Sequence, residues 1–239
     1  MTFGGVCSKK KNAHRPFLTI VGNPLPGQRH LDATVGGTAA MADGGVDAAF
    51  PPSDSSLFSD PTASPPPGAA PLQWLLPSDF SDAASQAADE SSLYGEPDQP
   101  IQLQQGQLSD LWLLSAMGAL ANRPELVKRL ISPCVPPASS SPRDGVGSGE
   151  RRRRRLYTVS LFRDGIVRHN VVVDDLLPCS ADGRPAYASA FVATAAGADM
   201  KGSGGQGSMR KYVLWPMLVE KAFAKLSGCY QALAAGSST

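Results

Sequence analysis

The stretch from Leu111 to Leu120 constrains the fold most, because it is apolar nearly all the way round a helix of ordinary pitch. Ser109 and Asp110 come directly before it. A Ser or Asp oxygen at that place accepts the free amide hydrogens of a first helical turn. The sequence therefore predicts a helix over 111–120 that begins after a side-chain cap and lies in the hydrophobic core.

Composition favours ordered segments separated by loops. The 239 residues are 42% hydrophobic and 18% charged, and the 24 Gly and 21 Pro concentrate in a few stretches. A formal net charge of +1 gives no overall attraction to nucleic acid or membranes. No apolar stretch approaches the roughly 20 residues that a membrane span needs, and the N-terminus lacks a secretory signal. We expect an intracellular, cytoplasmic protein.

Two further patterns predict a β-hairpin and a late helix. Residues 157–162 and 166–174 alternate as strands, and Asp164–Gly165 between them supplies a tight turn. Trp215 to Tyr230 is predicted to be a helix, with a proline in its first turn and Gly228 at its end.

The remaining segments are predicted to be less regular. A short helix is expected over 124–131, and residues 17–21 have the composition of a short strand. Residues 132–150 are rich in Pro, Ser and Gly, which predicts a surface insertion, and 190–208 is predicted to be a Gly-rich mobile segment. Residues 1–44 mix basic, Gly and Ala residues without sustained periodicity, which predicts a disordered or appended arm.

Three motifs stand in order along the chain, over residues 104–116, 171–178 and 218–233. Together they resemble the calpain family of papain-like cysteine proteases, whose nucleophile motif reads Gln-Gly-x-x-Gly-Asp-Cys-Trp-Leu. The matching positions are Gln105, Gly106, Asp110, Trp112, Asp174, Asp175, Trp215, Glu220 and Lys221. The resemblance spans residues 45–236, followed by a tail at 237–239. It implies an α+β fold, the first, helix-rich half of a papain-like, calpain-type protease core with a β-hairpin.

The resemblance also implies a catalytic cysteine at position 111, where this chain has Leu111. An isobutyl group has no lone pair and no acidic proton, so it cannot form an acyl-enzyme. Gln105 matches the family residue that donates its amide to the oxyanion, although an ordinary loop amide is the alternative. Trp112 matches the aromatic residue beside the nucleophile, and Ser109 replaces a glycine of the motif. The expected protein is a pseudoenzyme, a protease scaffold without protease chemistry.

The family's general base and its orienting Asn follow the last motif, and this sequence stops at Thr239, so we expect that half to be missing. His14 and His30 lie in the predicted arm, and His169 is expected to be an exposed strand residue. We expect none of the three to act as the base.

Four cysteines, Cys7, Cys134, Cys179 and Cys229, are widely spaced. Their spacing fits neither a zinc site nor a disulfide framework, and no histidine is positioned to activate any of them. We expect reduced thiols and no substitute nucleophile. Cys7 lies beside the basic residues 9–11, which suggests either an acylation site or, as we favour, a solvated basic segment.

Metal binding is also predicted to be lost. Family members bind calcium through oxygen ligands, but Gln102 and Arg210 stand where the resemblance implies acidic residues. We therefore expect no cofactor. The pair Asp174–Asp175 suggests acid–base chemistry or a metal site, or a structural role in accepting backbone amides at a turn, which we favour.

Five consecutive arginines, Arg151 to Arg155, either contact phosphate groups or form a solvated charged run, which we favour. The function we expect is a non-catalytic homologue that binds protein partners through the exposed surface of the cleft side, without binding nucleic acid or membranes. Two alternatives stay open. One is the calcium-dependent cysteine endopeptidase activity that the family implies, and the other is binding of anionic membranes or RNA through the arginines.

Overall fold

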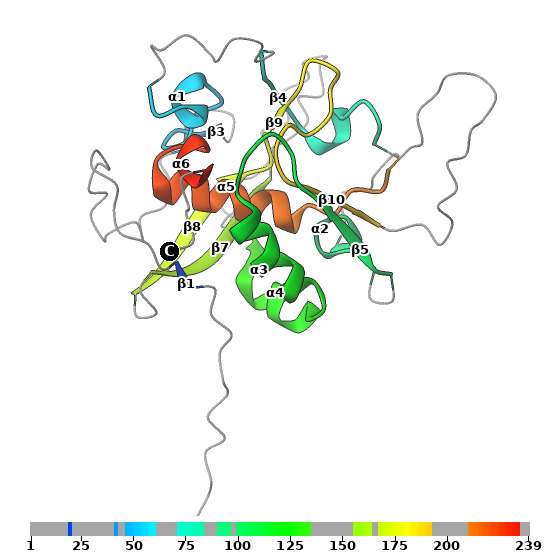
Figure 1. Cartoon of the computed structure of the whole chain (residues 1–239). Coiled ribbons are helices and arrows are strands. Elements are labelled where there is room, and N and C mark those ends of the chain that lie inside the picture. The colour runs from blue at the N-terminus through cyan, green and yellow to red at the C-terminus, as the bar shows by residue number, and fades with distance from the viewer. Residues whose placement is uncertain are drawn as a thin grey trace, which may run out of the picture.

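The computed structural model describes residues 19–20, 41–42, 46–60, 71–83, 90–96, 99–134, 155–163, 167–192 and 210–234. They form the expected α+β arrangement, in which α5 (Trp215–Ser227) runs through the centre of the molecule (Figure 1). All residues of α5 from Trp215 to Lys225 are buried, so this helix forms the axis of the hydrophobic core. No helix in the described ranges combines the length and apolarity needed to cross a membrane.

The predicted hairpin is confirmed as β7 (Leu156–Arg163) and β8 (Val167–Asp174). Cross-strand pairs such as Val159 with Val171 and Tyr157 with Val173 face the core, as the two-residue period of a strand requires. The other edge of β7 pairs with β6 (Ile131–Pro133) and, in parallel, with β1 (Thr19–Ile20).

The structure corrects two of the loop predictions. Residues 132 and 133, expected to open a surface insertion, belong to β6, and residues 190–192, expected to be mobile, belong to β10 (Ser189–Val192). Both segments pair with strands distant in the sequence, which local composition does not reveal. The rest of both predicted loops, and most of the predicted arm, lie outside the described residues.

Three short antiparallel pairs complete the strands. Strand β10 pairs with β5 (Ile101–Gln104), β4 (Gln73–Leu75) pairs with β9 (Leu177–Cys179), and β2 (Met41–Ala42) pairs with β3 (Val46–Asp47). Because the β5–β10 pair leads directly into the nucleophile motif, it fixes where the site begins.

The predicted central helix is present as α3 (Leu111–Ala121), but it is not buried all round. Leu113, Leu114 and Met117 are buried, whereas Leu111 and Ser115 are exposed. Most of the other outward positions carry Ala, Gly or Ser, whose exposure to water costs little.

The predicted side-chain cap is also wrong. Asp110 holds the N-cap position of α3, but its side chain makes no capping hydrogen bond. Its backbone carbonyl accepts the amides of Leu113 and Leu114 instead, and its carboxyl group lies in the protein interior.

The other helices follow the predicted order. The short second helix is α4 (Pro124–Leu130), and α5 ends at Ser227, three residues before the predicted end, because Gly228 adopts a φ of +99° that terminates the helix. The shortest helices are α1 (Asp54–Leu57), η1 (Pro77–Asp79), α2 (Glu90–Tyr94) and α6 (Gln231–Ala234).

Candidate functional site

The loop between β5 and α3 carries the nucleophile motif and is held by hydrogen bonds and by close approach of its backbone to neighbouring carbonyl groups. The Gln105 side chain donates from Nε2 to the Leu108 carbonyl at 2.9 Å. The backbone amide of Gln107 donates to the Ala186 carbonyl at 2.8 Å. A Cβ atom on Gly106 would lie 2.2 Å from the Tyr187 carbonyl oxygen and 2.3 Å from that of Ala186. Gly106 is therefore required by close backbone approach.

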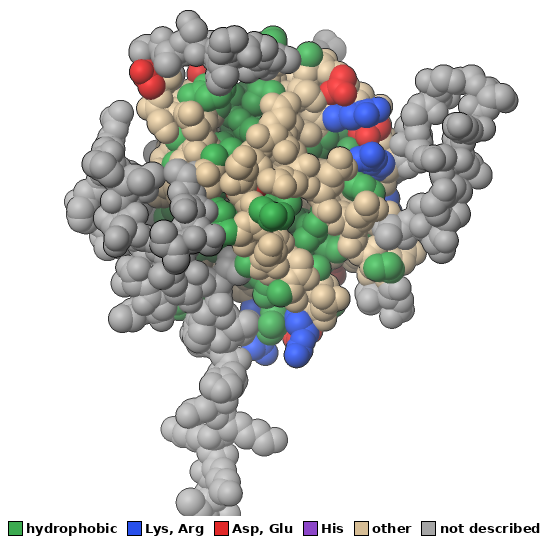
Figure 2. Space-filling model, viewed as in Figure 1, with side chains coloured by type: hydrophobic (Ala, Val, Ile, Leu, Met, Phe, Trp, Pro, Cys, Tyr) green, Lys and Arg blue, Asp and Glu red, His purple; other side chains and the backbone are tan. Residues whose placement is uncertain are grey.

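Leu111 is the first residue of α3, and its exposed fraction is 61%. Among the described residues, it is the one large hydrophobic side chain that is exposed. Figure 2 shows the molecule in the view of Figure 1, with hydrophobic side chains in several places on this face and charged side chains mainly toward its margins. The nucleophile position is therefore accessible from outside, but it presents only hydrocarbon.

Trp112 fixes the start of α3 against the C-terminal helices. Its indole Nε1 donates to the Leu233 carbonyl at 3.1 Å, and its ring meets Phe223 edge-on with centroids 5.9 Å apart. Since Phe223 belongs to α5 and Leu233 to α6, these contacts orient the neighbouring Leu111 toward solvent.

Asp110 and Glu220 place two carboxyl groups close together behind the start of α3. Both are buried, with exposed fractions of 1% and 2%. The backbone amide of Ala188 lies 3.2 Å from each carboxyl oxygen of Glu220. Burial raises the pKa of both groups, and the negative charge of Asp110 raises the pKa of Glu220 further.

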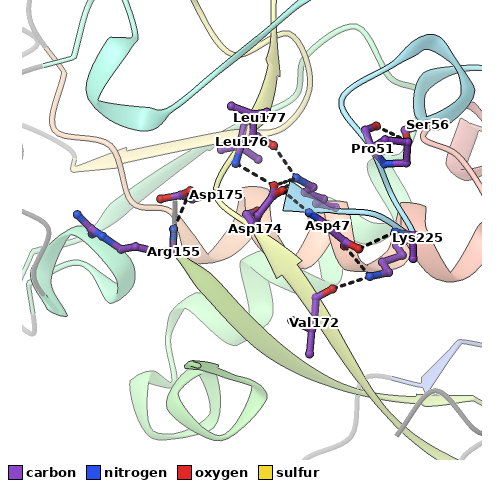
Figure 3. A network of polar contacts seen from close by, with 12 residues as sticks. Asp47, Pro51, Ser56, Arg155, Val172, Asp174, Asp175, Leu176, Leu177 and Lys225 are labelled. Carbon is purple, nitrogen blue, oxygen red and sulfur yellow. Dashed lines mark hydrogen bonds and ion pairs between the residues drawn. The ribbon is translucent and has the colours of Figure 1, made fainter. Parts of the chain in front are cut away.

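Asp174 and Lys221 belong to a buried ionic network that joins α5 to the end of β8 and to β3. Lys221 forms an ion pair with Asp174 and donates to the Leu176 carbonyl at 2.6 Å. Figure 3 shows the adjoining part, in which Lys225 lies 2.5 Å from the Asp47 carboxylate and donates to the Val172 carbonyl at 2.8 Å.

The Asp174 carboxylate also accepts two backbone amides. Leu176 donates to Oδ1 and Asp47 donates to Oδ2, each at 3.1 Å (Figure 3). A carboxylate with an ammonium group and two amides already bound is fully engaged in holding the chain. These contacts are those of a structural residue.

Asp175 makes a separate contact with Arg155. Its Oδ1 accepts the Arg155 backbone amide at 3.1 Å, and its own amide donates to the Arg155 carbonyl at 3.1 Å. Burial raises its pKa to about 6, a shift that the hydrogen bond from Arg155 opposes. Arg155 itself is exposed, and the other four arginines of the run lie outside the described residues.

Gln102 and Arg210, the two positions considered for calcium, carry a neutral and a basic side chain. Gln102 lies on β5, opposite Phe191 of β10. The guanidinium of Arg210 lies over the Phe191 ring, 4.5 Å from its centroid, and donates to the Gln104 side chain at 3.1 Å. Its Nε is 3.6 Å from the buried Asp82 carboxylate. Within the described ranges, no three His, Cys, Asp or Glu side chains cluster as metal ligands would.

Three of the four cysteines are described, and each contacts an ordinary neighbour. Cys134 Sγ lies 2.9 Å from the Thr158 hydroxyl, and Cys229 Sγ lies 3.3 Å from that of Ser59. Cys179 is buried, which raises the pKa of its thiol to about 12. These contacts provide no base for any of the three thiols. Cys7 lies outside the described residues.

The expectation that His169 is exposed is wrong, because it is half-buried. Residues 169, 171 and 173 share one face of β8, and His169 pairs in register with Leu161, which is fully buried. His169 thus lies on the inner face of the hairpin. His14 and His30 lie outside the described residues.

Several residues around the site were not predicted from the sequence. Ala186 and Tyr187 close the space behind the motif loop, and Asp47 completes the ionic network. Lys225 stands within the third motif, so its place in that pattern was an available signal. The other three depend on contacts between distant segments, and the local sequence carries no sign of them.

Comparison with known proteins agrees with this geometry. The family described as calpain family cysteine protease matches residues 46–239. A calpain-type cysteine protease of Zea mays is 30% identical over 191 residues, which are 80% of this chain and 7% of that protein. Calpain-10 of Rattus norvegicus is 30% identical over 190 residues, 80% of this chain and 23% of that protein.

A third relative, the calpain-1 catalytic subunit of Gallus gallus, is 33% identical over 135 residues, 56% of this chain and 15% of that protein. The chain thus spans less than a quarter of the length of each of these relatives. The matched region contains the motif loop, the hairpin and α5, and the chain belongs to the calpain family of cysteine proteases.

Proposed function

We propose that this chain is a non-catalytic member of its family, which acts by binding protein partners and does not cleave them. The observation that carries the proposal is Leu111 at the head of α3, where the family has its nucleophile. Covalent catalysis by such a protease requires a thiolate, and a leucine side chain supplies neither a lone pair nor a proton. The peptide carbonyl would meet hydrocarbon.

The contacts that hold the motif loop and the start of α3 are kept, which favours a surface retained for binding over a loop that has lost its structure. Gly106 and Trp112 still make the contacts that hold the motif loop and the start of α3. The Gln105 amide, which in the family faces the oxyanion, donates one of its hydrogens to the Leu108 carbonyl. In this chain the amide therefore has a structural partner inside its own loop.

The exposed Leu111 side chain supports a binding role. Burying a leucine against a partner stabilises a complex by about 1.5–3 kcal/mol, and its backbone is held in place by Trp112. A rigid, exposed apolar group of this kind suits an apolar pocket on a protein partner.

We further propose that calcium does not bind at Gln102 and Arg210. The Arg210 guanidinium is held by Gln104 and Asp82, so a positive charge already stands beside β5. A divalent cation placed there would be repelled, and Gln102 adds no charge to offset this. Calcium should therefore leave the thermal unfolding midpoint unchanged, apart from the general effect of ionic strength, for which magnesium is the comparison.

The decisive experiment measures hydrolysis of a fluorogenic peptide by the purified chain, with and without calcium. We expect no hydrolysis above that of a sample without protein. Hydrolysis that iodoacetamide abolishes would refute the proposal and favour the endopeptidase alternative. A Leu111→Cys variant is assayed in parallel for comparison, because it places a thiol at this position without changing the rest of the loop.

Binding is tested separately with a photo-reactive amino acid at position 111 and, for comparison, at the exposed position Ser115. Crosslinked partners are then measured quantitatively against wild type and Leu111→Asp. We expect that partners crosslinked from position 111, and not from 115, bind Leu111→Asp at least tenfold more weakly. Equal affinity of both proteins would show that Leu111 takes no part in binding.

A further inference from the structure

The strongest unexplained feature of the structure is the buried pair Asp110 and Glu220. Asp110 ends the motif loop, and Glu220 lies in the middle of α5, the most buried helix. Both carboxyl oxygens of Asp110 are buried, and no donor among the described residues reaches either with acceptable geometry. Each carboxyl group is close enough to the other to shift its pKa.

Two ionised carboxylates in this arrangement would be strongly unfavourable. Each would lose its hydration, they would repel each other at short range, and Asp110 would be left without any hydrogen bond. Lys221, which follows Glu220 in α5, is already paired with Asp174. Among the described residues, the donor that reaches Glu220 is the Ala188 amide. A single proton between the two groups removes the repulsion and provides the missing hydrogen bond.

The position of the two groups indicates which one carries the proton. Asp110 lies at the N-terminus of α3, where the helix dipole favours a negative charge. Glu220 lies in the interior of a buried helix, where burial and the negative charge of Asp110 both raise its pKa. Glu220 is therefore the better proton holder, donating to Asp110.

We propose that Glu220 is protonated at neutral pH and donates a hydrogen bond to Asp110, so that one shared proton fastens the head of α3 to α5. Loss of this proton at higher pH leaves two buried charges and loosens the segment that carries Leu111. The nucleophile-motif surface is thereby sensitive to pH, independently of whether the chain cleaves peptides.

Several other ionisable groups among the described residues lie around the pair. Tyr187 and Tyr230 stack beside it with ring centroids 4.7 Å apart, and burial raises the pKa of both phenols above the ordinary value. Cys229 lies near Tyr187, and Asp174 and Cys179 lie near Tyr230. Of these, Asp174 is engaged in its ion pair with Lys221.

The direction of the pH effect follows from the raised pKa of the folded pair. The stabilisation is complete below the ordinary glutamate pKa of 4.5, decreases as the pH rises above it, and is lost once the pH passes the pKa of the folded pair. Glu220→Gln should remove this dependence, because its amide donates to Asp110 at every pH and carries no charge.

The direct test is infrared spectroscopy of the full chain at pH 7 with isotopically labelled glutamate. We expect the carbonyl band of a protonated carboxylic acid in wild type, its loss in Glu220→Gln, and its persistence in the control Glu125→Gln, whose side chain is exposed. Absence of this band from wild type would overturn the proposal, and this measurement does not require any variant to fold.

The second readout is local. Amide hydrogen exchange at Leu113 and Leu114, whose amides donate to the Asp110 carbonyl, should accelerate at least tenfold beyond the intrinsic base-catalysed increase as the pH is raised. Glu220→Gln should abolish the extra acceleration, and Glu125→Gln should keep it. Equal acceleration in Glu220→Gln and wild type would show that the proton is not shared there.

Discussion

Lys221 is buried against Asp174, and this ion pair joins the centre of α5 to the end of β8. The lysine also donates to the Leu176 carbonyl, and its ammonium lies 5.4 Å from the centroid of the Trp74 ring. Burial lowers the pKa of Lys221, an effect that the Asp174 charge opposes. Asp174, for which acid–base chemistry was one alternative, thus joins β8 to α5 through this ion pair.

Removing one member of this pair should be costly. Lys221→Met leaves the Asp174 carboxylate buried without its cation, and we expect the free energy of unfolding to fall by about 3–5 kcal/mol. Urea unfolding followed by circular dichroism measures this change. The control is Lys128→Met, whose pair with Glu90 is largely exposed, so we expect a much smaller loss from this variant. Similar losses in both variants would contradict the structural role assigned to Lys221.

Two glycines should respond to alanine in opposite directions. Gly106→Ala places a Cβ against the Ala186 and Tyr187 carbonyls, so the motif loop must shift, and we expect a loss of about 1–3 kcal/mol. Gly118 lies within α3, and its Cβ would meet only the Leu103 side chain at 3.7 Å. Gly118→Ala should therefore stabilise the helix by up to about 1 kcal/mol. Thermal unfolding of both variants tests these two expectations. A Gly106→Ala protein as stable as wild type would mean that the loop does not approach these carbonyls.

The raised pKa of Asp175 predicts how the stability of the fold depends on pH. Because burial raises this pKa from 3.8 to about 6, the folded state holds the proton more tightly than the unfolded state. Proton binding by Asp175 therefore adds to the free energy of unfolding. This contribution is complete below pH 3.8, falls as the pH rises and is lost above about pH 6, and the change is on the order of 2–3 kcal/mol.

Asp175→Asn keeps the acceptor for the Arg155 amide but does not titrate. Unfolding free energies measured between pH 4 and pH 7 should therefore vary less for this variant than for wild type. The exposed carboxyl group of Glu125 provides the matched control, as Glu125→Gln should leave the wild-type slope unchanged. A slope unaffected by Asp175→Asn would show that this carboxyl is ionised throughout the range.

The elements predicted correctly are those whose signal is local. The alternation in 157–174 predicted the hairpin, and the proline in the first turn together with the terminal glycine predicted α5. Strands β5 and β10 were not predicted, because each is four residues long and finds its partner about 90 residues away. Such pairing depends on the tertiary fold, which periodicity does not report.

The site shows the same division. The motif identified Leu111 and its neighbours, since residue order alone was enough. It did not show that the Asp110 carboxyl group is buried and makes no capping hydrogen bond, because its neighbour Glu220 lies on another helix. The backbone constraint on Gly106 likewise comes from Ala186 and Tyr187, distant residues whose carbonyls close the space.

The cysteines provide a last prediction, which bears on whether another thiol replaces the missing nucleophile. A reactive thiol requires access and a lowered pKa. Cys179 has neither, since it is buried and its pKa is raised to about 12. Cys134 is partly accessible, and its sulfur lies beside the Thr158 hydroxyl.

Brief alkylation of the native chain with iodoacetamide, followed by peptide mapping, should label Cys134 at the rate of an ordinary thiol and leave Cys179 and Cys229 unlabelled until denaturant is added. The thiol of free glutathione under the same conditions is the reference for an ordinary rate. A described cysteine that reacts at least a hundredfold faster than this reference at pH 6 would be a thiolate held by a nearby base. Such a residue would then be a candidate nucleophile in place of Leu111, and the non-catalytic function would have to be abandoned.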